Sequence, residues 1–77
     1  MKIAQLTPHT DWTFSVIAND GRVGQFDVRP YLQYEAFEEL KDIAEFLKLK
    51  NGGYFVEWEC GADLSADTIE AHMVVEN

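Results

Sequence analysis

The strongest constraint on the fold is a pair of strand-like segments that flank an Asn-Asp-Gly turn. In residues 12–18 the large apolar side chains would share one side of an extended chain: Trp12, Phe14, Val16 and Ala18. Alternation of this kind, with aromatic and β-branched residues, is typical of a strand with one buried face. Asp-Gly between two such segments is a strong hairpin signal, because tight hairpin turns need positive φ angles. The sequence therefore predicts a β-hairpin around Asn19-Asp20-Gly21.

The return strand, residues 22–28, has a less regular pattern. Val23 and Phe26 lie three residues apart and cannot share a face of a regular strand. A β-bulge at Gly24 would reconcile them, because bulges insert one extra residue and favour glycine. Pro30 ends this strand, and the weak alternation of residues 2–6 predicts a further strand ahead of the hairpin.

The next segment changes to a spacing of three and four residues, as on a helix: Phe37, Leu40, Ile43, Ala44 and Leu47. Asp42 followed by Glu45 resembles a capping box, which predicts two short helical turns joined near Lys41. A second hairpin is expected from residues 47–50 and 54–58 around Asn51-Gly52-Gly53.

Gly61 ends that hairpin, and Ser65 is expected to cap a final helix reaching about His72. Residues 74–77 would follow as a tail or a last strand. The order β-ββ-α-ββ-α predicts the α+β class in a single domain, residues 1–77. We expect one antiparallel sheet built from two hairpins, with short helices packed on one face.

Charge is distributed unevenly along the 77 residues, whose formal net charge is −8. Residues 51–77 contain six acidic residues and no lysine or arginine. Direct nucleic-acid binding is therefore not expected, because it depends on basic side chains that neutralise phosphates. The acidic segment either keeps the protein soluble or steers it toward a basic partner.

The single cysteine, Cys60, excludes an internal disulfide and fits a reducing compartment. No apolar segment approaches the length of a membrane-spanning helix, and the N-terminal residues do not resemble a signal peptide. We therefore expect a cytoplasmic protein without membrane contact.

Three carboxylates lie close together in sequence, at Asp63, Asp67 and Glu70. Such a group suits Mg²⁺ binding or general acid–base chemistry, as in a small metal-dependent hydrolase. The structural alternative is that Asp63 organises a turn and Asp67 faces the positive end of a helix dipole. His9 and His72 lack a second ligand at metal-binding spacing, so no metal or cofactor is expected.

The tyrosines and tryptophans exceed the needs of one small core, and a subset is expected to form an exposed patch for a partner. Arg29, beside Pro30 and Tyr31, would be a polar anchor for that patch or an internal partner of Asp27.

Several motifs occur together in a characteristic order: Asn19-Asp20-Gly21, Phe26-Asp27-Val28, Pro30, Phe37-Glu38-Glu39-Leu40-Lys41-Asp42, Phe46, Trp58 and Asp63-Leu64-Ser65-Ala66-Asp67-Thr68-Ile69. Over nearly its whole length the chain resembles the small bacterial family catalogued as domain of unknown function 2442. The resemblance implies a stand-alone protein, or the N-terminal domain of a longer chain with a helix-turn-helix. It also implies a gene beside another small family, similar to toxin–antitoxin pairs. The family has no assigned catalytic residues, and this chain has Glu59-Cys60-Gly61 where relatives often have Pro-Asn-Gly.

We therefore expect a non-enzymatic protein-interaction module, antitoxin-like or regulatory, that binds a small basic protein and has the edges needed to form a homodimer. The alternative is a metal-dependent hydrolase or ligand-binding enzyme that uses Asp63, Asp67 and Glu70. The predicted partner interface comprises Arg29, Tyr31, Tyr54, Glu57, Trp58, Asp63, Asp67 and Glu70.

Overall fold

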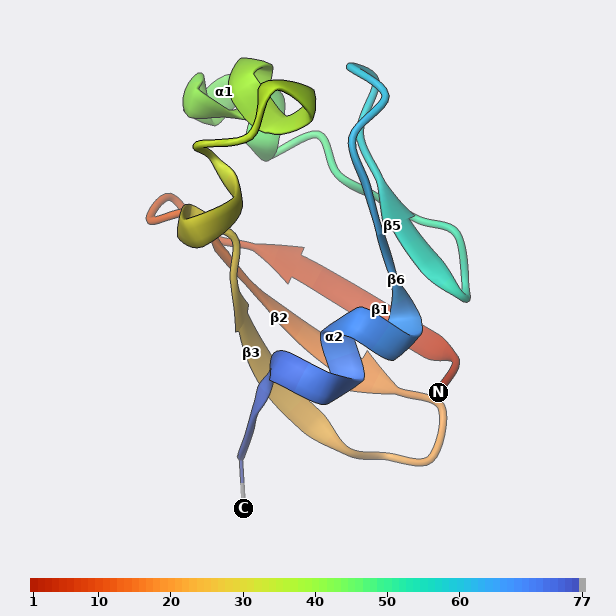
Figure 1. Ribbon diagram of the computed structural model, residues 1–77. Coiled ribbons are helices and arrows are strands. Elements are labelled where there is room, and N and C mark those ends of the chain that lie inside the picture. The colour runs from red at the N-terminus through yellow and green to blue at the C-terminus, as the bar shows by residue number, and fades with distance from the viewer. Residues whose placement is uncertain (77) are drawn as a thin grey trace.

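The computed structural model describes residues 1–76 and confirms the α+β class (Figure 1). A four-stranded antiparallel sheet has the order β1-β2-β3-β7, from β1 (Ile3–Pro8), β2 (Thr13–Ala18), β3 (Val23–Asp27) and β7 (Val74–Glu76). A second sheet has the order β4-β5-β6, from β4 (Lys50–Asn51), β5 (Phe55–Glu57) and β6 (Asp63–Ser65). The helical segments are η1 (Arg29–Tyr31), η2 (Glu35–Lys41), α1 (Ile43–Phe46) and α2 (Ala66–His72).

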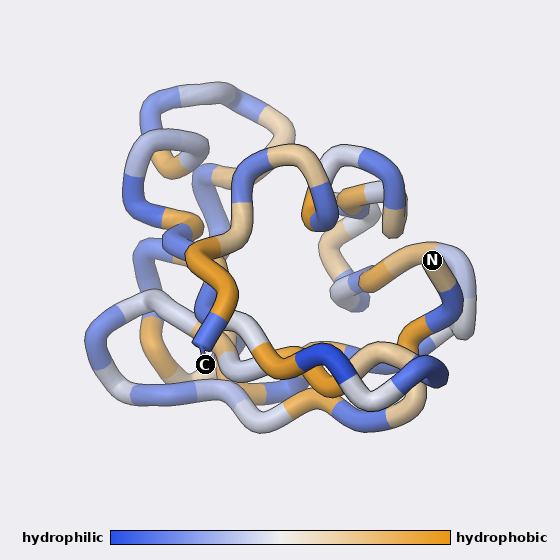
Figure 2. The backbone as a smooth tube through the Cα atoms, turned by 90° about the horizontal axis from the view of Figure 1, so that it is seen from below, coloured by the Kyte–Doolittle hydropathy of each residue, from blue (hydrophilic) through white to orange (hydrophobic). Residues whose placement is uncertain are grey.

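The expectation of one sheet was wrong, because the second hairpin does not join the first. β6, which was not predicted from the sequence, pairs with β5 and completes a separate sheet. Of the two forms expected at the end of the chain, a tail or a last strand, the strand is confirmed for residues 74–76: β7 pairs with β3 at the edge of the larger sheet. Asn77, the last residue of that expected segment, lies outside the described residues. Buried residues alternate with more exposed ones along β2 and β3, as expected of strands with one buried face, and Figure 2 shows hydrophobic residues interspersed with hydrophilic ones along the chain.

The first hairpin forms around Gly21, whose φ of 93° lies in the left-handed region that the turn requires. The predicted bulge at Gly24 was wrong, since β2 and β3 pair continuously from Thr13 opposite Asp27 to Ile17 opposite Val23. Gly24 itself is an inward-facing residue, and a Cβ at this position would lie 2.8 Å from Met73 Sδ. The register irregularity lies instead on β1, between Ile3 and Gln5.

Side-chain caps position the short helices. Asp42 Oδ1 accepts a hydrogen bond of 3.0 Å from Ala44 N and separates η2 from α1, which confirms two turns joined near Lys41. The reciprocal contact of a capping box is replaced by an ion pair between Glu45 and Lys48. Ser65 Oγ accepts from Thr68 N at 3.1 Å, so the predicted cap of α2 is also confirmed.

The core lies between the two sheets and the helices, and aromatic rings connect its parts. Phe14 stacks on Phe26 with centroids 5.2 Å apart, and Tyr31 lies 5.8 Å from Phe26 and 5.6 Å from Phe37. Trp58 continues the series, with ring centroids 6.2 Å from Phe37 and 6.0 Å from Phe46. In the part of the chain that the structure describes, no helix is long and apolar enough to cross a membrane.

Candidate functional site

Four of the eight predicted interface residues lie on or beside the second sheet. Glu57 and Asp63 are exposed neighbours across β5 and β6, and Lys50 lies opposite Glu57 on the other side. Val56 and Leu64 alternate with them and face the core. Phe55, on the same face as Glu57, remains 40% exposed. We call Phe55, Glu57 and Asp63 the acidic face.

Tyr54 and Asp67 flank this face near the beginning of α2. Tyr54 is 66% exposed, and its carbonyl oxygen accepts a hydrogen bond of 2.8 Å from Ala66 N. Asp67 is exposed in the first turn of α2, where its charge faces the positive end of the short helix, as predicted. The expectation that Asp63 organises a turn was wrong, because Asp63 is the first residue of strand β6.

Trp58 does not belong to an exposed surface. Its side chain is 3% exposed, and its indole Nε1 donates a hydrogen bond of 2.9 Å to the carbonyl oxygen of Phe46. This contact holds α1 against the second hairpin. The size and position of Trp58 favoured an interface role, but its hydrogen-bonding partner lies on another element and could not be found by spacing alone.

Glu70 is separated from the other two carboxylates by its contacts. Its Oε2 accepts a hydrogen bond of 2.6 Å from Arg22 Nη2, and its Oε1 lies 3.7 Å from the N-terminal amine. The hydrogen bond from Arg22 and the charge of that amine hold the pKa of Glu70 below its ordinary value of 4.5. Glu70 therefore links α2 to the first hairpin, where Arg22 also pairs with Asp20 at 2.9 Å.

This arrangement does not assemble the carboxylate site of Asp63, Asp67 and Glu70 on which the alternative function depends. Within residues 1–76, no three histidine, cysteine or acidic side chains meet in a way that could hold a metal ion. His9 is distant in sequence from these carboxylates, and its Nε2 forms a hydrogen bond of 2.7 Å with Ser15 Oγ on the larger sheet. Cys60 is half-buried in the turn between β5 and β6.

Arg29 forms the internal pair that the sequence offered as its alternative role. Its Nη2 lies 2.9 Å from Asp27 Oδ2, and its Nε and backbone N both donate to Asp27 Oδ1 at 2.9 Å. The hydrogen bonds from Arg29 hold the pKa of Asp27 below its ordinary value of 3.8. Arg29 and Tyr31 lie on η1, so they do not continue the acidic face of β5 and β6.

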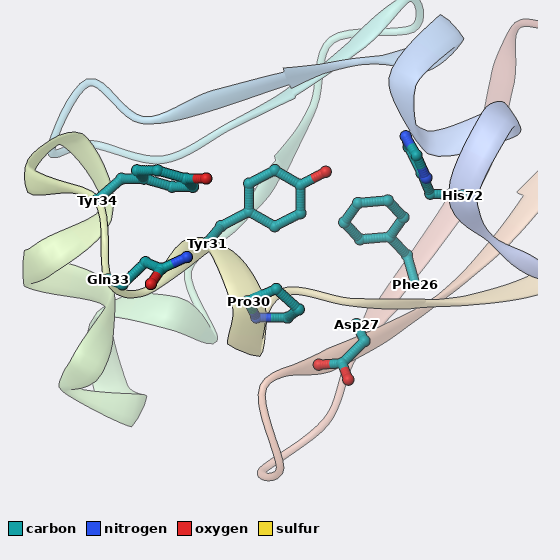
Figure 3. A pocket seen from close by; sticks show the side chains of 7 residues that line it. All are labelled: Phe26, Asp27, Pro30, Tyr31, Gln33, Tyr34 and His72. Atoms are coloured by element: carbon teal, nitrogen blue, oxygen red, sulfur yellow. The ribbon is translucent and has the colours of Figure 1, made fainter.

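A pocket of about 380 Å³ lies between η1, the segment that follows it and the end of α2 (Figure 3). Its walls are Phe26, Asp27, Pro30, Tyr31, Gln33, Tyr34 and His72. Only Tyr31 belongs to the predicted interface. Gln33 and His72 were missed, because residues 39 positions apart in sequence meet only once α2 has folded over the sheet. The two tyrosines that follow Pro30, Tyr31 and Tyr34, were the one feature of the sequence that pointed to this pocket.

The model of the family described as "Protein of unknown function (DUF2442)" matches residues 3–74. No curated protein and no solved structure matches the chain. The match covers both sheets except the last two residues of β7, and it includes the acidic face and all residues of the pocket; it confirms the family resemblance noted in the sequence motifs. The chain therefore belongs to the DUF2442 family.

Proposed function

We propose that the protein is a non-enzymatic interaction module that binds a small basic protein through its acidic face. The observation that carries this proposal is the placement of Glu57 directly opposite Asp63 on neighbouring strands. Like charges in this position destabilise a sheet, and a cationic side chain from a partner would relieve the repulsion. Among residues 1–76, no ion pair joins Glu57, Asp63 or Asp67 to a basic group.

The surroundings of the carboxylate pair support a protein partner. Phe55 and Tyr54 are exposed beside it, and aromatic side chains commonly contribute much of the binding energy at interfaces. An acidic, cytoplasmic bacterial module of this kind would act as the antitoxin-like or regulatory member of a two-protein system. It would mask the basic surface of its partner and release it when charges are screened.

Affinity capture from the native bacterium, with this protein as bait, tests the proposal. A single small basic protein should bind at low salt and elute at high salt. Replacing Glu57→Gln and Asp63→Asn together should weaken its binding at least about tenfold, since close charge pairs contribute 1.5 kcal/mol or more. Glu38→Gln with Glu39→Gln, which removes the same charge from exposed positions of η2, is the matched control. Equal loss in both double variants would contradict a role for the acidic face.

The metal-dependent alternative makes a separate prediction. If Asp63, Asp67 and Glu70 formed a metal site, Mg²⁺ or Mn²⁺ would raise the melting temperature of the wild type and not of Asp63→Asn. The contacts of Glu70 with Arg22 favour no such shift. A shift that depends on Asp63 would overturn the proposal of a non-enzymatic module.

A homodimer formed by strand pairing remains a prediction, and β7 is the edge where we expect it. β7 is an outer strand of the larger sheet, and Val74 and Val75 on it are 72% and 47% exposed. Sedimentation velocity should show a dimer that Val74→Lys reduces to monomer, because lysine on an edge strand opposes pairing. A dimer that persists in this variant would place the contact elsewhere.

A further inference from the structure

We propose that the pocket beside η1 receives the guanidinium group of an arginine side chain. The source of that arginine, a basic protein partner, rests on the proposed function, whereas the chemistry of the pocket stands on its own geometry. The pocket lies on other elements than the acidic face, so it would form a second point of attachment for the same partner.

The aromatic wall of the pocket is fixed before any ligand arrives. Tyr31 contacts the rings of Phe26, Phe37 and Tyr34, at centroid distances of 5.8, 5.6 and 6.4 Å. Backbone hydrogen bonds from Tyr31 N to Val28 O and from Tyr34 N to Tyr31 O, of 2.9 and 3.0 Å, fix the main chain. A site whose side chains are already ordered loses little conformational entropy on binding.

The rings present a corner and not a flat wall. The planes of Tyr31 and Tyr34 are inclined by 58°, and in Figure 3 the hydroxyl group of Tyr34 points toward the ring of Tyr31, while that of Tyr31 points toward the side of His72. Tyr34 is 56% exposed, so much of its ring is free for contact. A planar cation can lie on one ring face while its N–H groups reach a neighbouring oxygen, a geometry that guanidinium satisfies better than a compact ammonium.

The charge of the lining selects a cation. Its polar lining residues are Tyr31, Tyr34, Gln33, Asp27 and His72, and the lining includes no lysine or arginine. The whole chain carries a formal charge of −8, which repels anions and attracts cations. Phosphate, nucleotide and carboxylate ligands are therefore disfavoured.

The ion pair of Arg29 with Asp27 shows that this carboxylate can bind a guanidinium group. Arg29 already binds Asp27, at the rim of the pocket, through its guanidinium group. The two side chains are 60% and 43% exposed, so this pair contributes little to stability and can share its carboxylate with an incoming arginine. Arg29→Gln should therefore strengthen binding of an arginine probe, whereas an Arg29 that anchors a partner directly would not affect a small probe.

The experiment is a titration of the full chain with N-acetyl-L-arginine methylamide, followed by two-dimensional amide NMR. Shifts should concentrate at Tyr31, Gln33, Tyr34 and His72. The corresponding citrulline derivative has nearly the same shape without the charge, and it should produce shifts at least about fivefold smaller. Equal shifts with both probes, or none at these four residues up to tens of millimolar, would overturn the proposal.

Matched variants locate the site. Tyr34→Ala should abolish the arginine-dependent shifts, while Tyr54→Ala, which truncates another exposed tyrosine, outside the pocket, should leave them unchanged. Because Tyr34 is exposed, its truncation should preserve the remaining spectrum, which verifies folding. Loss of the shifts in Tyr54→Ala and their retention in Tyr34→Ala would place the cation elsewhere and contradict the assignment.

Two further arms separate this inference from the proposed function and from a metabolite. The Glu57→Gln, Asp63→Asn double variant should bind the arginine probe as the wild type does, even though it loses the partner. Free L-arginine should bind no more tightly than the blocked probe, because its carboxylate is repelled. At least tenfold tighter binding of free arginine would identify a metabolite site and overturn the partner as the source.

Discussion

Trp58 shows at the residue scale how a large aromatic side chain serves stability when its polar atom has a partner. The indole satisfies the carbonyl group of Phe46 inside the core, where an unpaired carbonyl would cost about 1–3 kcal/mol. We predict that Trp58→Phe lowers the free energy of unfolding by about that amount, measured by urea denaturation with Trp12 fluorescence as the probe. Tyr54→Phe should stay within about 0.5 kcal/mol of the wild type. A neutral Trp58→Phe would mean that the carbonyl finds another partner.

Gly24 illustrates a second residue-scale constraint, that of space. A Cβ at this position would lie 2.8 Å from Met73 Sδ and 3.2 Å from the carbonyl oxygen of Val74. Gly24→Ala is therefore predicted to destabilise the protein by about 1–3 kcal/mol, because β7 or Met73 must move. Gly52→Ala is the control: its Cβ would meet the ring of Phe55, which is 40% exposed and can rotate away. Similar losses in both variants would contradict this explanation.

Elements that are distant in sequence are joined by Glu70, which contacts the first hairpin through Arg22. The pKa of Glu70 is lowered in the native state by the hydrogen bond from Arg22, so its carboxylate stabilises the fold above its ordinary value of 4.5. That contribution is lost as the pH falls through the lowered native pKa. The carboxylates of Asp20 and Asp27 likewise stabilise the fold above their ordinary pKa of 3.8, because hydrogen bonds from Arg22 and Arg29 lower their pKa values in the native state. Their contributions are lost as the pH falls below 3.8.

Thermal unfolding between about pH 6 and pH 3 should therefore show a falling melting temperature below about pH 4.5. In Glu70→Gln the melting temperature should start lower at pH 6 and fall less steeply through the same range. If the melting temperature of Glu70→Gln falls with decreasing pH as steeply as that of the wild type, the pairing of Glu70 with Arg22 does not persist in solution.

The elements differed in how far the sequence could predict them. Asp20-Gly21, Asp42 and Ser65 act within two or three residues of themselves, so the turn and both helix caps were predicted correctly. Gly24 and β6 depend on distant segments: Met73 packs closely against Gly24, and pairing with β5 makes a strand of residues 63–65. Such tertiary contacts produce no periodic pattern in the local sequence, so they could not be predicted from it.

The same difference between local signals and contacts between distant segments applies to the candidate site. Glu57 and Asp63 could be identified from the acidic composition of residues 51–77, although their pairing across strands could not. The pocket escaped prediction because Tyr34 and His72 belong to different elements and their spacing carries no motif. Trp58 and Glu70 were assigned to an interface from their residue type and their position in the sequence, and both have partners within the fold.

The whole molecule is governed by its net charge of −8 on 77 residues. Its carboxylates outnumber its basic groups, and the pairs of Arg22 and Arg29 with acidic side chains are exposed. Exposed pairs contribute little, whereas uncompensated charge of one sign repels itself throughout a compact fold. Screening should consequently stabilise this protein more by reducing repulsion than it destabilises it by weakening the pairs.

We therefore predict that raising NaCl from about 10 to 150 mM, which shortens the Debye length from about 30 to 8 Å, increases stability by on the order of 1 kcal/mol. For a domain of this size that corresponds to a melting temperature about 4–8 °C higher, measurable by calorimetry. The variant with Glu38→Gln, Glu39→Gln, Glu57→Gln and Asp63→Asn carries half the net charge and should show a smaller increase. A fall in melting temperature with salt would mean that the ion pairs of Arg22 and Arg29 outweigh the repulsion.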